Sequence, residues 1–107
     1  MTFAIHVRRF VSRLLKITSN LEDGKQVIKS SGSVGANYIE ANEKLGPKDL
    51  GYRMKIARKE AKETVYWLKV IKGSNDLDEE TIKENEYLID EAEQLQRILS
   101  AIINKLK

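Results

Sequence analysis

Hydrophobic residues recur at alternating spacings of four and three along three segments of the chain, which is the period of an amphipathic helix. In the first segment the stripe consists of Phe3, Val7, Phe10, Leu14 and Ile17. A middle segment keeps the alternation at Leu50, Met54, Ala57, Ala61, Thr64, Leu68 and Ile71, and a last segment at Leu88, Ala92, Leu95, Leu99, Ile102 and Leu106. Each stripe predicts a helix that buries one face against other helices.

Three short breaks divide the chain into four stretches: the three periodic segments and a stretch near residues 20–45, between the first and middle segments. Ser, Thr, Asn and Asp cap helix starts, Gly ends helices, and Pro fits the first turn of a helix. The residues of these kinds in the breaks are Thr18, Ser19, Asn20, Gly46, Pro47, Gly73, Asp76 and Asp78. The sequence therefore predicts a single all-α domain with four helices, near 2–17, 20–45, 48–72 and 77–106, joined by short links.

The stretch "SSGSVGA" at residues 30–36 allows two interpretations. Five of its seven residues are Ser or Gly, which normally marks a loop and would suggest a phosphate cradle or a nucleophile turn. The loop interpretation lacks a motif, because no Lys follows Gly35 and Ser31 occupies the first glycine position of a nucleophile elbow. Inside a helix, the same residues form a smooth face for close packing of another helix. We therefore predict that residues 30–41 lie within the second helix as a packing surface.

The composition suits one soluble globular domain, with 107 residues of which 33% are charged and 41% hydrophobic. Cysteine is absent and His6 is the one histidine, so disulfides, thiolate metal sites and a multi-histidine metal site within one chain are excluded. No stretch approaches the ~20 apolar residues of a membrane span, and the basic residues of the first segment do not fit a signal peptide. We expect a cytoplasmic protein without a metal or other cofactor and without a membrane partner.

The net charge of +3 conceals a separation of charge along the chain. Lys and Arg outnumber acids six to two over residues 1–29 and nine to three over 44–72, whereas acids outnumber them nine to four over 73–107. Such a separation indicates a face for an anionic partner, or basic and acidic faces that meet. The candidate nucleic-acid-binding residues are Lys55, Arg58, Lys59, Lys62 and Lys69 on one side of the third helix, and Arg8, Arg9, Arg13 and Lys16 on the first.

This basic set has two interpretations. Neutralising several phosphates gives a protein affinity for nucleic acid of any sequence, but most charged helix faces are simply solvated. No RNA-recognition motif is present, and the aromatic residues do not form an obvious stacking platform. These aromatic residues are Tyr38, Tyr52, Tyr66, Trp67 and Tyr87.

Four polar residues of the middle helices are candidate members of a structural polar network: Asn37, Glu40, Glu60 and Glu63. Glu60 falls about 60° from the centre of its helix's apolar stripe, so we expect it to be partly buried. A buried carboxylate needs a partner, which Asn37, Arg53 or Arg58 can supply. The alternative is a pair of carboxylates that binds a divalent metal, but di-metal bundles use Glu-x-x-His on facing helices, and no histidine is available there.

Two sequence elements carry a family resemblance. The first is S-x-G-A-N-x-x-E-A, matched at Ser33, Gly35, Ala36, Asn37, Glu40 and Ala41. The second is I-A-x-x-E-A-x-E-T-x-x-W-L, matched at Ile56, Ala57, Glu60, Ala61, Glu63, Thr64, Trp67 and Leu68. With these elements, the chain resembles the four-helix bundle proteins encoded by intervening sequences in bacterial 23S ribosomal RNA genes, although its first segment is short for that family.

The resemblance implies an antiparallel up-and-down four-helix bundle that assembles into a ring, usually a homopentamer, and no enzymatic activity. A related group serves as the accessory protein of diversity-generating retroelements, where a basic ring works beside a reverse transcriptase and binds nucleic acid. With no catalytic motif in the sequence, the function favoured is a non-catalytic accessory protein that binds RNA or DNA through its basic face. The alternative is a scaffold for another protein, for example a reverse transcriptase, without direct contact to nucleic acid.

Overall fold

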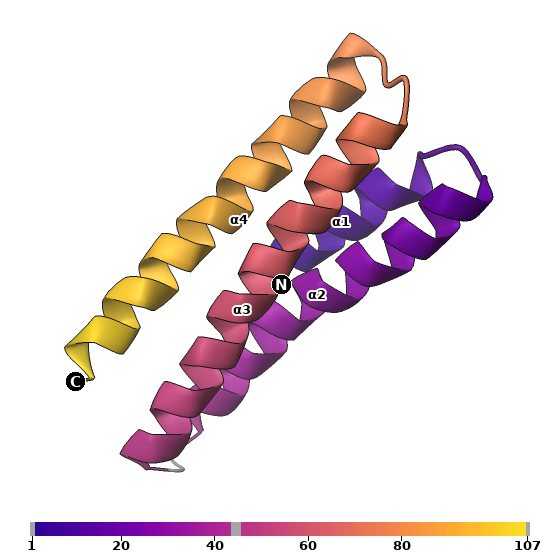
Figure 1. The fold of residues 1–107 in the computed structure, drawn as a ribbon. Helices are drawn as coiled ribbons and strands as arrows, with labels where there is room; N and C mark the ends of the chain where they lie inside the picture. The colour runs from indigo at the N-terminus through magenta and orange to yellow at the C-terminus, as the bar shows by residue number, and fades with distance from the viewer. Residues whose placement is uncertain (1, 44–45, 107) are drawn as a thin grey trace.

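The computed structural model describes residues 2–43 and 46–106, which form an antiparallel bundle of four helices (Figure 1). The helices are α1 (Thr2–Ser12), α2 (Thr18–Asn42), α3 (Pro47–Ser74) and α4 (Glu79–Lys105). Each long helix packs against its neighbour in the chain, and α1 packs against α2 and α4. The predicted all-α four-helix bundle is confirmed, with residues 30–41 inside α2.

The buried side chains fall into two clusters, one towards each end of the bundle. All four helices contribute to the first cluster, in which buried Val7, Phe10, Val27, Leu68, Ile71 and Leu88 are joined by Leu14. The second draws only on α2, α3 and α4, and consists of Val34, Ala41, Met54, Ala57, Ala61, Leu99 and Ile103. We call the ends that contain these clusters the four-helix half and the three-helix half. The predicted stripe of α3 is confirmed, because Met54 to Ile71 are buried at each stripe position.

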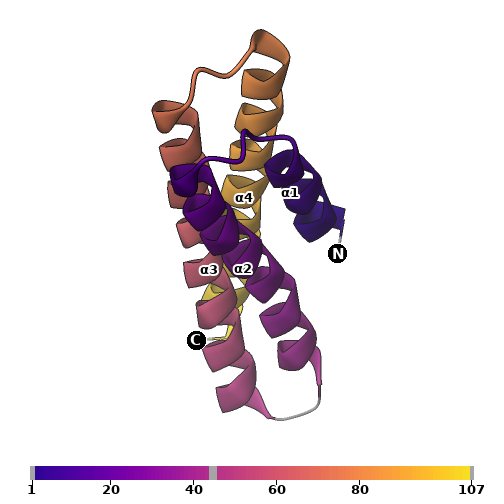
Figure 2. The ribbon, with the colours of Figure 1, turned by 90° about the vertical axis from the view of Figure 1, so that its right-hand side faces the viewer.

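Helix α1 is shorter than the 2–17 that the sequence predicts, because its backbone changes course at Ser12. The amides of Arg13 and Leu14 donate to the carbonyls of Phe10 and Val11, three residues back, which tightens the chain out of the α-helix. Leu14 nevertheless stays buried, so the hydrophobic spacing continues past the end of the helix. The eleven residues of α1 span about 16 Å of a bundle 46 Å long. Figure 2 shows α1 beside one half only, with its N-terminus near the middle of the bundle.

Several helix starts and ends differ from those that the sequence predicts. Helix α2 begins at Thr18 after Ile17, and no side chain caps it. Helix α3 continues to Ser74, one residue beyond the predicted glycine stop. The cap predicted at Asp78 is confirmed, because its carboxylate accepts from the Thr81 amide at 2.8 Å at the start of α4. Gly46 does not end the second helix as predicted, because α2 ends at Asn42. With a φ of +102°, Gly46 instead lies directly before α3 in a conformation that favours glycine.

Asn20 has another role than the predicted cap. Its side-chain amide exchanges two hydrogen bonds of 2.8 Å with the side chain of Asn75, which follows α3. Asn20 Nδ2 also donates to the carbonyl of Leu15, and Asn75 Nδ2 to that of Ile71. This asparagine pair therefore joins the α1–α2 connection, the start of α2 and the end of α3.

The small residues of α2 allow close packing at some positions but not at all. A Cβ at Gly24 would lie 2.7 Å from Val11 Cγ1, so α1 approaches α2 closely there. Ser30 is buried and its hydroxyl lies 2.8 Å from that of Thr64 on α3. A Cβ at Gly35 would meet nothing within 4 Å. The close helix contact expected around Gly35 is thus not made within the described chain. Residues 44–45, the end of the predicted second helix, lie outside the described residues.

Candidate nucleic-acid interface

The outer face of α3 carries four of the nine predicted phosphate-binding residues. Lys55, Lys59, Lys62 and Lys69 are all exposed on this helix. Helix α3 packs against α2 on one side and α4 on the other, and the short α1 packs against those same two helices. The lysine side of α3 therefore faces away from the bundle and is open to a large anionic ligand.

Two tyrosines lie on the same face and were missed as part of the site. Tyr52 and Tyr66 expose 62% and 59% of their surface. Together with the lysines they follow an alternating spacing of three and four, which keeps them on one side of a helix. The stripe is Tyr52, Lys55, Lys59, Lys62, Tyr66 and Lys69. We call it the Tyr–Lys stripe; its spacing is visible in the sequence once cations and aromatic residues are examined together.

Neighbouring groups already engage two of the predicted cations on α3. Arg58 is half-buried, and its guanidinium donates to Ser100 Oγ of α4 at 3.4 Å. The Lys59 ammonium lies 3.9 Å from the Glu63 carboxylate one turn away. Because Lys59 is exposed and Glu63 is only half-buried, the pair contributes little to stability. Arg58 holds α3 to α4 and is less available than the lysines.

The cations of α1 form a separate surface. Arg8 and Arg9 of α1, and Arg13 and Lys16 of the connection that follows it, are exposed. Helix α1 lies against α2 and α4, away from the outer face of α3. Arg13 pairs with Glu84 of α4, and His6 Nε2 lies 3.3 Å from the same carboxylate. The structure thus does not bring the first-helix cations together with those of α3.

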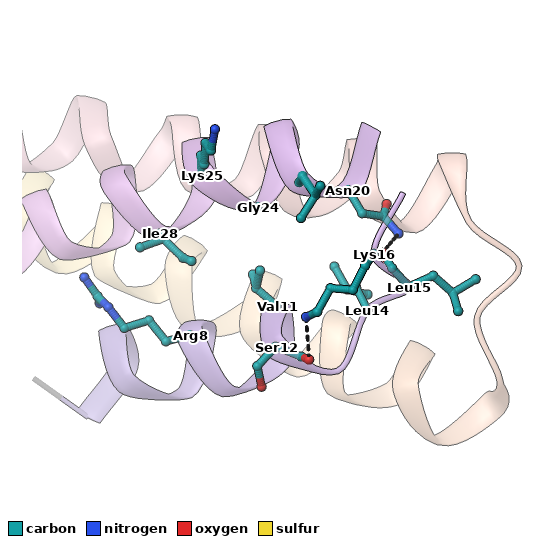
Figure 3. Close-up of a pocket in the computed structure, with 11 residues that line it drawn as sticks. Arg8, Val11, Ser12, Leu14, Leu15, Lys16, Asn20, Gly24, Lys25 and Ile28 are labelled. Atoms are coloured by element: carbon teal, nitrogen blue, oxygen red, sulfur yellow. Dashed lines mark hydrogen bonds between the residues drawn. The ribbon is translucent and has the colours of Figure 1, made fainter. Parts of the chain in front are cut away.

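Arg8 and Lys16 border a hollow of about 250 Å³ between α1 and α2 (Figure 3). The Lys16 ammonium donates to the Ser12 carbonyl, and the Arg8 guanidinium donates to the Ala4 carbonyl. Exposed Leu15 lies at one end of the hollow. Two of the four predicted cations of the first segment, Arg8 and Lys16, therefore border a small apolar recess.

The four candidate network residues do not meet. Asn37 is 9% exposed and donates from Nδ2 to the carbonyl and hydroxyl of Ser33, at 2.9 and 3.0 Å, while its Oδ1 accepts from Arg53 at 3.2 Å. Glu40 is exposed. Glu63 is half-buried, as is Glu60. The observed network is therefore Asn37 with its serine and arginine partners, which links α2 to α3.

Glu60 lies in a less favourable environment for its charge. Burial, followed by repulsion from Glu63, raises the pKa of this carboxyl above its ordinary value of 4.5, and nearby Lys59 and Lys29 oppose the shift. In the described chain its carboxylate has no ion-pair or hydrogen-bond partner. Neither Arg53 nor Arg58, which the sequence suggested, reaches it.

An apolar groove of about 540 Å³ lies between α2 and α4, next to the start of α1. Phe3 and Ala4 border it from α1, and the remaining lining residues are Ser31, Gly32, Val34, Gly35, Ala36, Tyr38, Ile39, Leu95 and Ile98. Ile39 and Ile98 are more than half exposed. The groove occupies the position beside the three-helix half that a longer α1 would cover.

Within residues 2–43 and 46–106, no group of three or more His, Asp or Glu side chains is placed to hold a metal ion. His6 instead contacts Glu84 and lies with its ring centroid 5.7 Å from that of Tyr87. None of the described helices is both long enough and apolar enough to cross a membrane.

The comparisons with known proteins decide the family. A family model described as 23S rRNA-intervening sequence protein matches residues 1–101. The chain belongs to this family. A similar solved structure is the crystal structure of a protein of unknown function from the S23 ribosomal protein family of Bacteroides thetaiotaomicron VPI-5482. It is 27% identical, with a TM-score of 0.79, over 95% of this chain and 92% of that one. No curated protein matches the chain.

In this 23S rRNA-intervening sequence protein, the two sequence elements that suggested the family lie on α2 and α3. Asn37 of the first element accepts from Arg53 of α3. Thr64 of the second lies within hydrogen-bond distance of Ser30 of α2, and Ala57 and Ala61 are fully buried. These residues hold the α2–α3 hairpin together, so the resemblance rests on residues that fix the packing of the bundle.

Proposed function

We propose that this protein is a non-catalytic accessory factor that binds RNA or DNA through the outer face of α3. The observation that supports the proposal is the row of four exposed lysines on a face that no other helix of the bundle covers. Lysines that neutralise phosphates release condensed counterions, and this release gives affinity independent of sequence and strongly dependent on salt. Repetition of the face in an oligomer, which the family resemblance implies, would multiply the number of phosphate contacts.

The test is to replace three exposed lysines together, as Lys55→Gln, Lys59→Gln and Lys62→Gln. The lysines are preferable to Arg58, because Arg58 also bonds to α4. Fluorescence anisotropy with labelled RNA and DNA at several salt concentrations gives the slope of log K against log salt. We expect the slope to become shallower by about 2 on single strands, since each phosphate contact contributes about −0.7, while circular dichroism stays unchanged.

The matched control replaces two exposed lysines of α4, as Lys83→Gln and Lys105→Gln. Both lysines lie on α4 and not on the outer face of α3, and the Lys83 ammonium lies 3.7 Å from the Glu79 carboxylate, so we expect little change in affinity. If the α3 variant binds as tightly as the parent at every salt concentration, the lysine row is only a solvated face and the proposal is wrong.

A second candidate function is a protein scaffold, for example for a reverse transcriptase, assembled from several copies of the chain. The apolar groove between α2 and α4 favours it, because Ile39 and Ile98 expose large apolar side chains that another protein can cover.

We propose a homo-oligomer, with five copies as the family resemblance implies. Light scattering at micromolar concentration should give a multiple of the 12.3 kDa chain mass, and Ile39→Glu with Ile98→Glu should reduce it. A monomeric parent would contradict the proposal.

A further inference from the structure

We infer that the Tyr–Lys stripe of α3 binds single-stranded nucleic acid, with Tyr52 and Tyr66 stacking on unpaired bases. The inference rests on the proposed function and adds the class of ligand. It depends on a feature that the lysines alone do not provide, which is two exposed aromatic rings on the line of the cations. Proteins that bind single strands without sequence preference combine such a basic track with aromatic stacking platforms.

The spacing places the two rings on one side of the helix. Tyr52 and Tyr66 are fourteen residues apart, which is close to four helical turns and about 21 Å along the axis. Lys55, Lys59 and Lys62 lie between them and Lys69 follows, so the stripe extends over about 25 Å. That length accommodates about four extended nucleotides, the lower end of the site sizes of known single-strand binding folds.

The ring of Tyr66 is held in position before any ligand arrives. It makes an edge contact with the Trp67 indole, with 4.9 Å between the ring centroids. Trp67 is itself partly buried against the core of the four-helix half. A side chain that is already ordered loses less conformational entropy on binding than a free one, so Tyr66 is suited to be a stacking platform.

The rings favour single strands over duplexes. A base in a duplex is stacked on both faces and offers none to a tyrosine on the surface of a helix. In addition, the major groove of duplex RNA is too deep and narrow for side chains to read. The lysines can contact the phosphates of either ligand, whereas the tyrosines contribute only where base faces are free.

The surroundings define one edge of the stripe. Beyond Lys69, the ammonium of Lys72 lies 3.4 Å from the Glu86 carboxylate of α4. Asp90 and Glu93 of α4 line a recess between α3 and α4, which Lys69, Lys72 and Glu86 also line. These carboxylates repel phosphate, so the α4 side of Lys69 limits the path of the strand.

The experiment compares affinities for short single strands and duplexes of both RNA and DNA, at several salt concentrations, using the full chain. The ligands are a labelled 12-nucleotide oligo-U, the corresponding oligo-dT, and 12-base-pair duplexes of each kind. The variant is Tyr52→Ala with Tyr66→Ala. We expect single-strand affinity to fall by at least about fivefold for each ring and duplex affinity to change by less than about twofold, with the salt slope unaltered because no charge is lost.

Two control variants separate stacking from other effects. Tyr52→Phe with Tyr66→Phe keeps both rings and should retain single-strand binding. Tyr87→Ala removes an exposed tyrosine from α4, away from the stripe and from the apolar groove, and should leave binding unchanged. Equal binding of oligo-U and oligo-dT would support contacts confined to phosphates and base faces, whereas tighter binding of oligo-U would identify RNA as the ligand.

The outcomes that overturn the inference differ from those that overturn the proposed function. If the alanine variant binds single strands like the parent while the triple lysine variant does not, the face binds phosphates and the tyrosines have no part in it. If the alanine variant loses duplex and single-strand affinity equally, the rings do not stack on free bases. If the parent binds none of the four ligands, the nucleic-acid function itself is wrong and the inference falls with it.

Discussion

The cores of the two halves of the bundle are built from side chains of different size. The four-helix half fills its core with large side chains such as Phe10, Leu68 and Ile71, supplied from every side. The three-helix half has no fourth helix and uses Ala41, Ala57 and Ala61 among its buried residues, which lets the remaining helices approach closely. In the described chain α1 packs beside the four-helix half, and the apolar groove between α2 and α4 lies next to the three-helix half, whose core includes these small residues.

The largest expected effect is the loss of unfolding free energy caused by Leu-to-Ala substitutions in the two cores. Leu68→Ala in the four-helix half removes a fully buried side chain from a site enclosed by four helices, and the cavity cannot collapse. Leu99→Ala makes the same change in the three-helix half, where the groove leaves room to relax. We expect losses of unfolding free energy near 4–5 kcal/mol for Leu68→Ala and near 2–3 kcal/mol for Leu99→Ala, measured by urea denaturation. An equal or reversed order would mean that the halves do not differ in how well they enclose their cores.

A smaller effect on stability is expected for Gly-to-Ala substitutions on α2. The substitution should destabilise the four-helix half and stabilise the three-helix half. Gly24→Ala places a methyl group 2.7 Å from Val11 Cγ1, and valine has little rotational freedom with which to yield. Overpacking of about 1–3 kcal/mol then outweighs the better helix propensity of alanine. Gly35→Ala meets nothing within 4 Å and should stabilise the protein by about 1 kcal/mol.

Thermal denaturation of both glycine variants gives the comparison, and Val11→Ala added to Gly24→Ala should restore the lost stability by making room for the methyl group. Two variants with melting temperatures shifted in the same direction would refute the assignment of the close α1–α2 contact to Gly24.

The smallest effect concerns the pH dependence of the three-helix half. Because the folded state raises the pKa of Glu60, the folded protein holds this proton more tightly than the unfolded chain does. Stability is therefore lost as pH rises from the ordinary value of 4.5 through the raised one. Glu60→Gln should remove this loss, so the parent becomes less stable relative to the variant over that interval. Urea denaturation from pH 4 to 7 measures it, with Glu80→Gln, an exposed carboxylate of α4, as the control; parallel curves for parent and Glu60→Gln would contradict the expectation.

The sequence was sufficient for the helices that carry a regular stripe. The spacing from Met54 to Ile71 predicted which side of α3 is buried, and the position of Asp78 predicted a cap. It did not predict the end of α1, because Leu14 keeps the hydrophobic spacing after the backbone has left the helix. A side-chain pattern reports burial, and burial continues through a tight turn.

The candidate site was predicted only in part, for two physical reasons. Helix periodicity placed Lys55, Lys59 and Lys62 on one face, but it holds no information on which helices are neighbours, so the separation of the α1 cations from α3 required the tertiary structure. The close α1–α2 contact at Gly24, which lies outside the predicted packing surface of residues 30–41, required it as well. Tyr52 and Tyr66 are a different case, because their spacing relative to the lysines was present in the sequence.

The asparagine pair affects how long the folded state lasts. Asn20 and Asn75 are 55 residues apart and lie at the open end of the α2–α3 hairpin, far from the turn at Gly46. Closing a loop of that length costs chain entropy that is recovered only when the intervening helices have paired, so we expect these two hydrogen bonds to form late in folding. Contacts that are absent from the transition state slow unfolding and leave the folding rate almost unchanged. We therefore expect the pair to prolong the lifetime of the folded bundle by slowing its unfolding.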